Sequence, residues 1–219
     1  KVRYYMKNIL IHGLGQNETS WNEVKDILNK NYIEVETPNL FNITKNYQLN
    51  YENLYKSFAD YCNGFKEKLN LIGLSLGGIL TIDYVIEYPE KVNAIILSGT
   101  PYEIPKTIFN IQNLIYKFMP KKVFEQIGCP KKDLINLLNS MKELSIPQKA
   151  KNIRCKTLII CGEREKNNIN MKSAKQLNND IKNSTFKIIP NAGHEINIDT
   201  PEEFANTIKL FLESEEISI

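Results

Sequence analysis

The segment Leu71–Gly78 constrains the fold of this chain most, because an apolar strand pattern changes there to a helical one through closely spaced glycines. Its sequence is LIGLSLGG, so glycines lie two residues before and two residues after Ser75. A turn this tight leaves no room for side chains at the flanking positions and holds the serine strained and exposed at a helix N-terminus. The amides there favour the negative charge that develops when an acyl carbonyl is attacked. The pattern predicts a nucleophilic serine; the alternative is a glycine-rich turn with an incidental serine.

The rest of the chain predicts an α/β fold with a mostly parallel, doubly wound sheet. Short apolar runs alternate with segments of helical spacing, which is typical of βαβ units covered on both faces. The six expected strands are Asn8–Ile11, Tyr32–Glu36, Leu69–Leu74, Ala94–Ser98, Thr157–Cys161 and Thr185–Ile189. The expected helices around them are Ser20–Leu28, Tyr51–Lys68, Leu76–Tyr88, Ala174–Asn178 and Pro201–Leu212. Thr200 and Glu203 would form a capping box at the last helix. The length suits a single domain over residues 1–219.

The connection after the fourth strand is too long for a plain crossover and predicts an inserted helical cap over residues 100–152. It contains two helical patterns, Ile108–Met119 and Lys132–Glu143, separated by prolines. Four apolar residues of the first pattern share one face by three- and four-residue steps: Ile108, Ile111, Ile115 and Phe118. This face either packs onto the core or lines an acyl pocket, and its residues are the candidates for substrate binding.

Two histidines, His12 and His194, are available as a catalytic base. His194 follows the last expected strand, whereas His12 precedes the serine. Triads of this type run serine, acid, histidine along the chain, so His194 is the predicted base and His12 a structural residue. The loop after the first strand, HGLG, can supply an oxyanion donor. We expect the backbone N–H groups of Leu14 and Leu76 to hold the oxyanion, each contributing about 10²–10³-fold in rate.

The composition argues against several other functions. The formal charge is +3 and no basic groove with interleaved aromatic residues is visible, so nucleic-acid binding is not expected. Four cysteines without a C-x-x-C pair, and two histidines, do not predict a metal site. The third glycine of a G-x-G-x-x-G match would fall at Glu18, so no dinucleotide cofactor is expected. No signal peptide or span of ~20 apolar residues is visible, which predicts no integral membrane segment and a cytoplasmic location.

Taken together, the His12-Gly13 loop, the elbow at Ser75, Gly193-His194 and the strand order resemble the α/β-hydrolase superfamily, specifically its small, cap-bearing esterase and lipase-like members. The resemblance runs from about Lys7 to Leu212 and implies a serine, acid and histidine triad under a cap, without a cofactor. The acid departs from the usual pattern of glycine, two residues and aspartate. Here the loop is Gly162-Glu163-Arg164-Glu165, so Glu165 takes the place of the aspartate. Glu163 and Glu103 are the alternatives for the carboxylate that orients the imidazole.

The function expected from these residues is hydrolysis of a carboxylic ester of a small or medium acyl substrate through a Ser-Glu-His triad and an acyl-enzyme. An acyl thioesterase would use the same parts. A non-catalytic ligand-binding protein on the same scaffold is the alternative from another class, because a fold alone does not determine function. A lyase or carbon–carbon bond hydrolase would need further pocket residues. In the catalytic cases the partner is a small-molecule ester or thioester.

Overall fold

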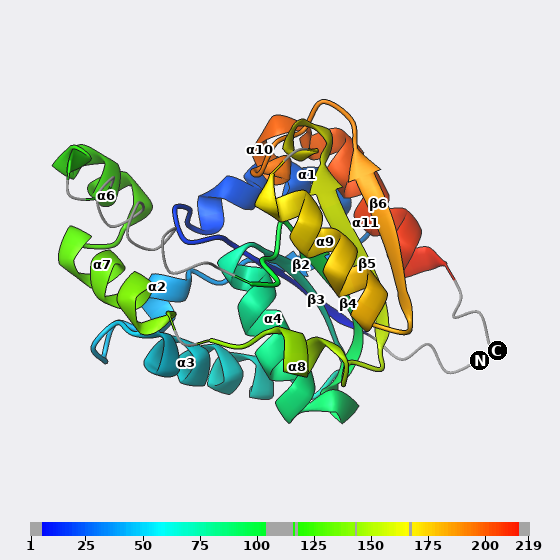
Figure 1. Cartoon of the computed structure of the whole chain (residues 1–219), viewed down its shortest axis with the longest axis horizontal. Helices are drawn as coiled ribbons and strands as arrows, with labels where there is room; N and C mark the ends of the chain where they lie inside the picture. The colour runs from blue at the N-terminus through cyan, green and yellow to red at the C-terminus, as the bar shows by residue number, and fades with distance from the viewer. Residues whose placement is uncertain (1–5, 104–115, 117, 143, 167, 215–219) are drawn as a thin grey trace.

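A single sheet of six parallel strands forms the centre of the molecule (Figure 1). The computed structural model describes residues 6–103, 116, 118–142, 144–166 and 168–214. The strand order is β2-β1-β3-β4-β5-β6, and all neighbouring strands are parallel. The strands are β1 (Lys7–Ile11), β2 (Val35–Glu36), β3 (Leu69–Leu74), β4 (Val92–Ser98), β5 (Lys156–Gly162) and β6 (Ser184–Ile189). The predicted fold class is confirmed.

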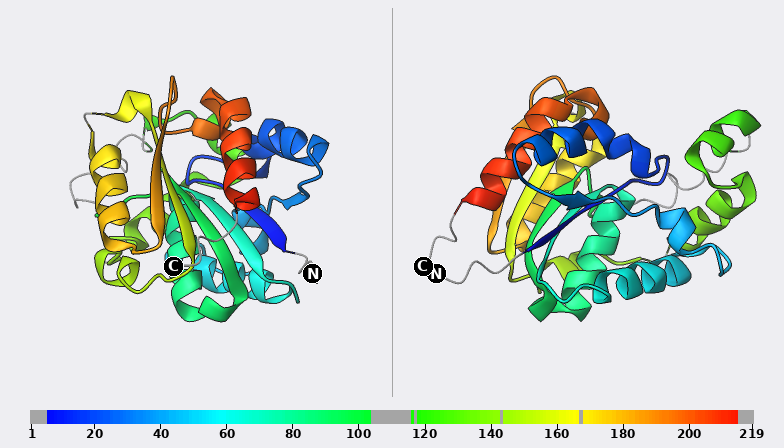
Figure 2. Two further views of the ribbon diagram at one scale, coloured as in Figure 1. Left: turned by 90° about the vertical axis from the view of Figure 1, so that its right-hand side faces the viewer. Right: turned by 180° about the vertical axis from the view of Figure 1, so that it is seen from behind.

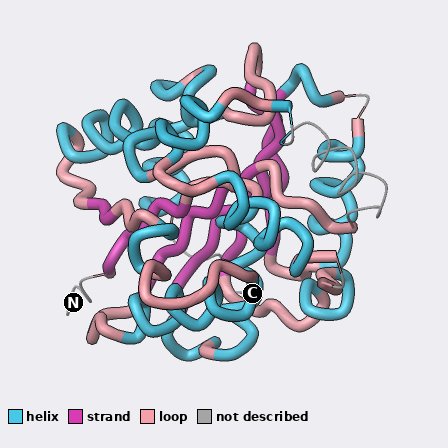
Figure 3. Tube along the Cα trace, turned by 90° about the vertical axis from the view of Figure 1, so that its left-hand side faces the viewer, coloured by secondary structure: helices cyan, strands magenta, loops and turns pink. Residues whose placement is uncertain are grey.

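Helices cover both faces of this sheet (Figures 2 and 3). One face carries α3 (Tyr51–Asn63), α4 (Leu76–Glu87) and α9 (Ile169–Asp180), whose apolar side chains form one core cluster with the strands. The other face carries α1 (Asn22–Lys30) and α11 (Pro201–Glu213), which pack together over a second cluster. Every residue of β3 is buried between these layers. A strand covered on both sides has no solvent-facing side, which explains why its sequence is apolar apart from Asn70, whose side chain is hydrogen-bonded to those of Asn8 and Asn93.

Short helices occupy the connections between these elements. They are η1 (Glu18–Trp21), α2 (Leu40–Ile43), η2 (Pro89–Lys91), α6 (Lys121–Ile127), α7 (Lys131–Ser140), α8 (Pro147–Ala150), η3 (Glu163–Glu165) and α10 (Ile196–Asp199). Between β4 and β5, α6 and α7 lie at the end of the molecule opposite to α11, and α7 contacts α3 (Figure 1). By contrast, α8 packs against α4 and α9 and belongs to the main helical layer. In the described part of the chain, no helix has the length and apolar character that a membrane crossing requires.

Several predicted boundaries were wrong, and local hydrogen bonds explain the differences. The strand expected from residue 32 begins only at Val35, because Tyr32 adopts a left-handed conformation with φ of 61° at the end of α1. The helix expected to reach residue 68 ends at Asn63, where the Gly64 N–H bonds back to Asp60. In contrast, α9 is longer than expected, because Asn168 accepts hydrogen bonds from two backbone N–H groups and starts the helix at Ile169.

The predicted capping box at α11 was also wrong. The helix does begin at Pro201, but the Thr200 side chain makes no capping bond. Its hydroxyl is buried without a hydrogen-bond partner among the described residues. The Glu203 carboxylate turns away from the helix end and lies 2.9 Å from Lys187 Nζ on β6. A cross-element ion pair therefore replaces the local contact that the spacing predicted.

Candidate active site

Ser75 occupies a strained turn between β3 and α4. Its φ of 53° and ψ of −110° lie outside the regions that L-residues normally adopt. The Ser75 N–H donates to the Ser98 carbonyl at 2.8 Å, which ties the turn to β4. A Cβ atom at Gly73 would lie 2.4 Å from the Gly77 carbonyl oxygen, and one at Gly77 would lie 2.3 Å from that of Ile11. The prediction that side chains do not fit at these two positions is confirmed.

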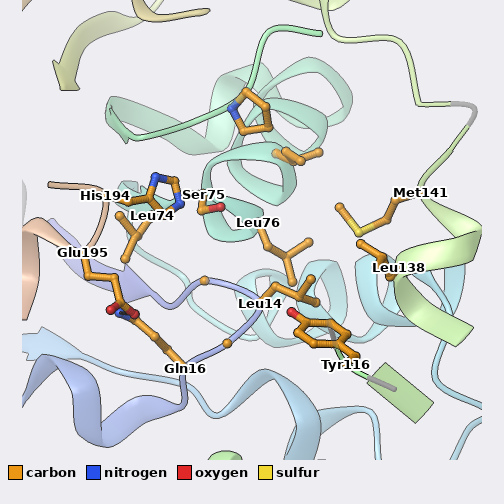
Figure 4. A pocket seen from close by; sticks show the side chains of 14 residues that line it. Leu14, Gln16, Leu74, Ser75, Leu76, Tyr116, Leu138, Met141, His194 and Glu195 are labelled. Atoms are coloured by element: carbon orange, nitrogen blue, oxygen red, sulfur yellow. Dashed lines mark hydrogen bonds between the residues drawn. The ribbon is translucent and has the colours of Figure 1, made fainter. Parts of the chain in front are cut away.

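The serine opens into a pocket of about 370 Å³, which is within the range of small-molecule sites. The pocket has two unlike walls on either side of Ser75 (Figure 4). The polar wall consists of Gln16, His194 and Glu195. The apolar wall consists of Leu76, Tyr116, Leu138 and Met141. Such a division can place an apolar and a polar part of one ligand on opposite sides of a reacting centre.

Parallel strands bring the candidate residues to this pocket from distant parts of the sequence. Ser75 follows β3, Glu165 lies in η3 directly after β5, and His194 follows β6. The carboxyl ends of parallel strands meet at one edge of the sheet, where ligands bind in folds of this type. The imidazole of His194 is turned toward the Ser75 hydroxyl (Figure 4). It packs against Gly99, where a Cβ atom would lie 3.0 Å from the ring and where φ is +53°.

Glu165 is the carboxylate that the structure brings to His194. Its Oε1 lies 3.6 Å from His194 Nδ1, an ion-pair distance that is longer than a hydrogen bond. The residue is only 4% exposed. Burial acts to raise the pKa of this carboxyl, but His194 and the amides of Asn170 and Asn168 outweigh it, so the pKa is lowered. Glu165 is therefore ionised at neutral pH.

The two alternative glutamates make other contacts. Glu163 Oε1 lies 2.9 Å from Lys166 Nζ, and its Oε2 accepts a hydrogen bond from the backbone N–H of Asn191. Glu103 is exposed at the end of the segment after β4. Of the three glutamates, Glu165 alone has a contact with His194 among the described residues.

The sequence analysis missed Asn170, which touches both members of this pair. Its Nδ2 donates to Glu165 Oε1 and lies 3.2 Å from His194 Nδ1. An amide nitrogen can only donate, so in this arrangement Nδ1 accepts and the ring proton is on Nε2. The available signal was Asn168, because an asparagine N-cap there places Asn170 in the first turn of α9, beside the loop that holds Glu165.

The two predicted oxyanion donors border the same pocket. Leu14 lies in the loop after β1, and Leu76 is the first residue of α4. Within the described part of the chain, neither backbone N–H has a hydrogen-bond partner. The N–H groups of a first helical turn lack an intrahelical acceptor, so the Leu76 amide is available to a ligand.

Comparisons with known proteins agree with this architecture. Residues 44–144 match the family model described as serine aminopeptidase, S33 (Hydrolase_4), a span that includes the Ser75 elbow. An esterase from Thermogutta terrifontis has the same fold, with a TM-score of 0.73 and 20% identity over 95% of this chain and 89% of that one. The chain therefore has the α/β-hydrolase fold. The family model ends before Glu165 and His194, so the match does not extend to these two residues.

Two curated proteins are similar to this chain in sequence. A pimeloyl-[acyl-carrier protein] methyl ester esterase from Wigglesworthia glossinidia brevipalpis is 28% identical, over 93% of this chain and 92% of its own length. A putative 2-succinyl-6-hydroxy-2,4-cyclohexadiene-1-carboxylate synthase from Bacillus subtilis is 26% identical, over 67% of this chain and 66% of its own. The chain thus spans slightly less than two thirds of the Bacillus protein.

The predicted substrate-binding face lies mostly outside the described residues of the chain. Ile108, Ile111 and Ile115 belong to the part of the chain that the structure does not describe. Phe118 does not line the pocket; it is 82% exposed. Tyr116 lines the pocket in its place, and its ring contacts Phe124 of α6. Leu138 and Met141, at the end of α7, complete this wall and were not among the predicted residues.

His12 has a structural position in this fold. It is fully buried behind the loop after β1. Its Nε2 accepts a hydrogen bond from the Leu40 N–H at 3.0 Å, which places the ring proton on Nδ1, 2.9 Å from the Gly13 carbonyl. Burial is the largest influence and lowers the pKa of His12 to about 4. The imidazole is therefore neutral and joins this loop to α2.

This lowered pKa predicts a loss of stability in mild acid. As the pH falls from about 6.5 to about 4, the unfolded chain binds a proton at His12 that the folded chain does not. The free energy of unfolding therefore falls over this window, by about 2 kcal/mol at pH 5 relative to pH 7. Urea unfolding at the two pH values, on the wild type and on His12→Gln, measures this component. The variant should lose about that much less between pH 7 and pH 5, and equal losses in both proteins would contradict the assignment.

Proposed function

We propose that this α/β-hydrolase cleaves a carboxylic ester of a small or medium acyl group, with Ser75 as nucleophile and His194 as base. The observation that carries the proposal is the strained conformation of Ser75 at the N-terminus of α4. Its side chain lines a pocket of about 370 Å³, and the His194 ring is turned toward its hydroxyl. A non-glycine residue at positive φ costs free energy, and such strain is found mainly at functional sites. The same turn presents the Leu76 amide to the reacting carbonyl.

The chemistry would proceed in two halves. Ser75 Oγ attacks the ester carbonyl while His194 Nε2 takes its proton, and the N–H groups of Leu14 and Leu76 hold the oxyanion. His194 then returns the proton to the departing alcohol and leaves Ser75 acylated. Water attacks the acyl-enzyme in the same way, with His194 again acting as base. The products are a carboxylic acid and an alcohol.

Glu165 would act through the imidazole. Base catalysis at Nε2 requires the ring proton on Nδ1, facing a carboxylate that stabilises the imidazolium. Asn170 Nδ2 shares this space and competes with His194 for Glu165 Oε1. Before attack, the ring proton would therefore move from Nε2 to Nδ1 by exchange with solvent, and Glu165 would close in from 3.6 Å and replace the Asn170 amide at Nδ1. Asn170 is thus a positioning residue that keeps Glu165 ionised between turnovers.

The apolar wall is the surface on which the acyl chain of the substrate would pack, on the side of Ser75 opposite to His194. Leu138 and Met141 are buried in the hydrophobic core cluster around α7, and Tyr116 packs against it. The esterase named among the relatives acts on a pimeloyl-[acyl-carrier protein] methyl ester, and a thioesterase would need the same residues. A direct comparison of oxygen esters with thioesters separates these two possibilities.

A series of p-nitrophenyl esters from acetate to palmitate tests the proposal. We expect kcat/KM to be highest for an acyl chain of short to medium length and to fall at least about tenfold for palmitate, because the pocket is at the small end of the range for ligand sites. Matched acyl thioesters are measured alongside. A thioester preference of about 100-fold would assign a thioesterase instead. Binding of the esters without turnover at any length would indicate a non-catalytic ligand-binding protein.

A further inference from the structure

The polar wall of the pocket contains a carboxylate that the proposed chemistry does not use. Glu195 follows His194 directly and lines the pocket, and its Oε1 accepts a hydrogen bond from Gln16 Nε2 at 2.9 Å (Figure 4). Gln16 comes from the loop after β1 and is only 6% exposed. Segments almost the whole chain apart are thus joined at one side of Ser75.

A buried amide network fixes this carboxylate. Gln16 Nε2 also lies 3.3 Å from Asn197 Oδ1, and Gln16 Oε1 accepts from Ser20 Oγ at 3.1 Å and from Asn197 Nδ2 at 3.3 Å. Asn197 is 1% exposed and is held in turn by the Ser20 carbonyl. The polar groups of Gln16 are therefore already engaged by the protein. A network satisfied in this way is rigid, so Gln16 orients Glu195 and leaves Glu195 Oε2 to meet a ligand.

The charge of the described pocket wall is negative. Glu195 is the carboxylate among the described residues that line it, and these residues include no lysine or arginine. No ion pair within the described part of the chain involves Glu195. An unpaired carboxylate on the wall of a cleft attracts cations and disfavours anions, and its effect is moderate here because the side chain is exposed to solvent.

The position of Glu195 indicates which part of a substrate it would meet. In acyl transfer the histidine gives its proton to the leaving group, so the leaving group lies on the histidine side of the serine. Glu195 lies on that side, and the apolar wall lies on the other (Figure 4). We propose that this pocket selects esters whose leaving alcohol carries an amino or ammonium cation, which Glu195 binds while the acyl chain packs on the apolar wall. This inference rests on the proposed function and specifies its substrate class.

Butyrylcholine and 3,3-dimethylbutyl butyrate, its isostere with carbon in place of the ammonium nitrogen, form the test pair. For the wild type we expect kcat/KM to favour the cation by roughly three- to tenfold at low salt, the size expected for a partly exposed charge pair. The preference should shrink as salt is added. In Glu195→Gln the ratio of the two kcat/KM values should fall to about one. The control is Glu90→Gln, because Glu90 is exposed before β4 at the opposite edge of the sheet.

Calorimetry on Ser75→Ala separates this inference from the proposed function. We expect that protein to bind butyrylcholine more tightly than the uncharged ester, and the double variant Ser75→Ala, Glu195→Gln to bind both alike. If Ser75→Ala shows this binding preference but the wild type hydrolyses neither ester, the proposed function is rejected and the cation site is retained. Equal affinity for both esters, no measurable binding of either, or a preference that survives Glu195→Gln would overturn the cation site, whatever the turnover.

Discussion

Replacing Ser75 by alanine lowers kcat for ester hydrolysis by about 10⁵-fold, because Ser75 is the only serine, threonine or cysteine among the described residues that line the pocket. The remaining rate would come from the oxyanion donors and from binding alone. The hydroxyl of Ser75 makes no hydrogen bond within the described part of the chain, so its loss should leave the fold intact. Alanine at position 75 would adopt the same backbone conformation, with a φ of 53°, and would keep most of its strain. We therefore expect a Tm close to that of the wild type.

Steady-state kcat on p-nitrophenyl butyrate, together with a thermal melt, measures both parts of this expectation. Ser214→Ala is the matched control, because Ser214 is exposed after α11 and its hydroxyl contacts Lys156 at the start of β5, far from the elbow. Its turnover should equal that of the wild type. If Ser75→Ala retained turnover within tenfold of the wild type, another residue would have to be the nucleophile.

Replacing Glu165 by glutamine lowers kcat by about 10³–10⁴-fold. Glutamine keeps the size of the side chain but removes the charge that stabilises the imidazolium, and its amide can stabilise the wrong ring tautomer. Asn168 and Asn170 both donate to Glu165 Oε1. An NH₂ group of glutamine at this position would face these two donors and leave N–H groups without an acceptor in a buried site. The kcat on p-nitrophenyl butyrate is again the measurement, with circular dichroism to verify the fold.

Glu163→Gln and Glu103→Gln are the matched controls for this second prediction. Both residues are candidate acids by sequence, and neither has a contact with His194 among the described residues. Each substitution should change kcat by less than about threefold, since exposed ion pairs contribute little. A larger loss in Glu163→Gln than in Glu165→Gln would identify Glu163 as the acid and contradict the arrangement proposed here.

Features of the fold that depend on neighbouring residues in the sequence could be predicted. The bounds of β3 were predicted correctly, because a strand buried on both faces is largely apolar and this one ends at the glycine turn. The steric need for Gly73 and Gly77 also follows from the motif alone. The contact between Glu165 and His194 could be expected only from the order of the strands, because it requires β5 and β6 to be neighbours in the sheet.

Features that depend on tertiary contacts could not be predicted. Thr200 has the sequence of an N-cap, but the ion pair between Glu203 and Lys187 competes with the capping box. Phe118 matches the apolar period of its segment, yet its exposure is decided by what the rest of the molecule places beside it. The link from Gln16 to Glu195 joins residues 179 positions apart, and no local pattern reports such a pair.

Labelling with a fluorophosphonate probe, followed by mass spectrometry to locate the modified residue, tests the central claim most directly. The probe phosphonylates a serine only where a base and an oxyanion site activate it. We expect one label, on Ser75, that is absent in Ser75→Ala and formed far more slowly in Glu165→Gln. A label on another serine, or an unlabelled Ser75 in a folded wild-type protein, would contradict the claim that Ser75 is the activated nucleophile.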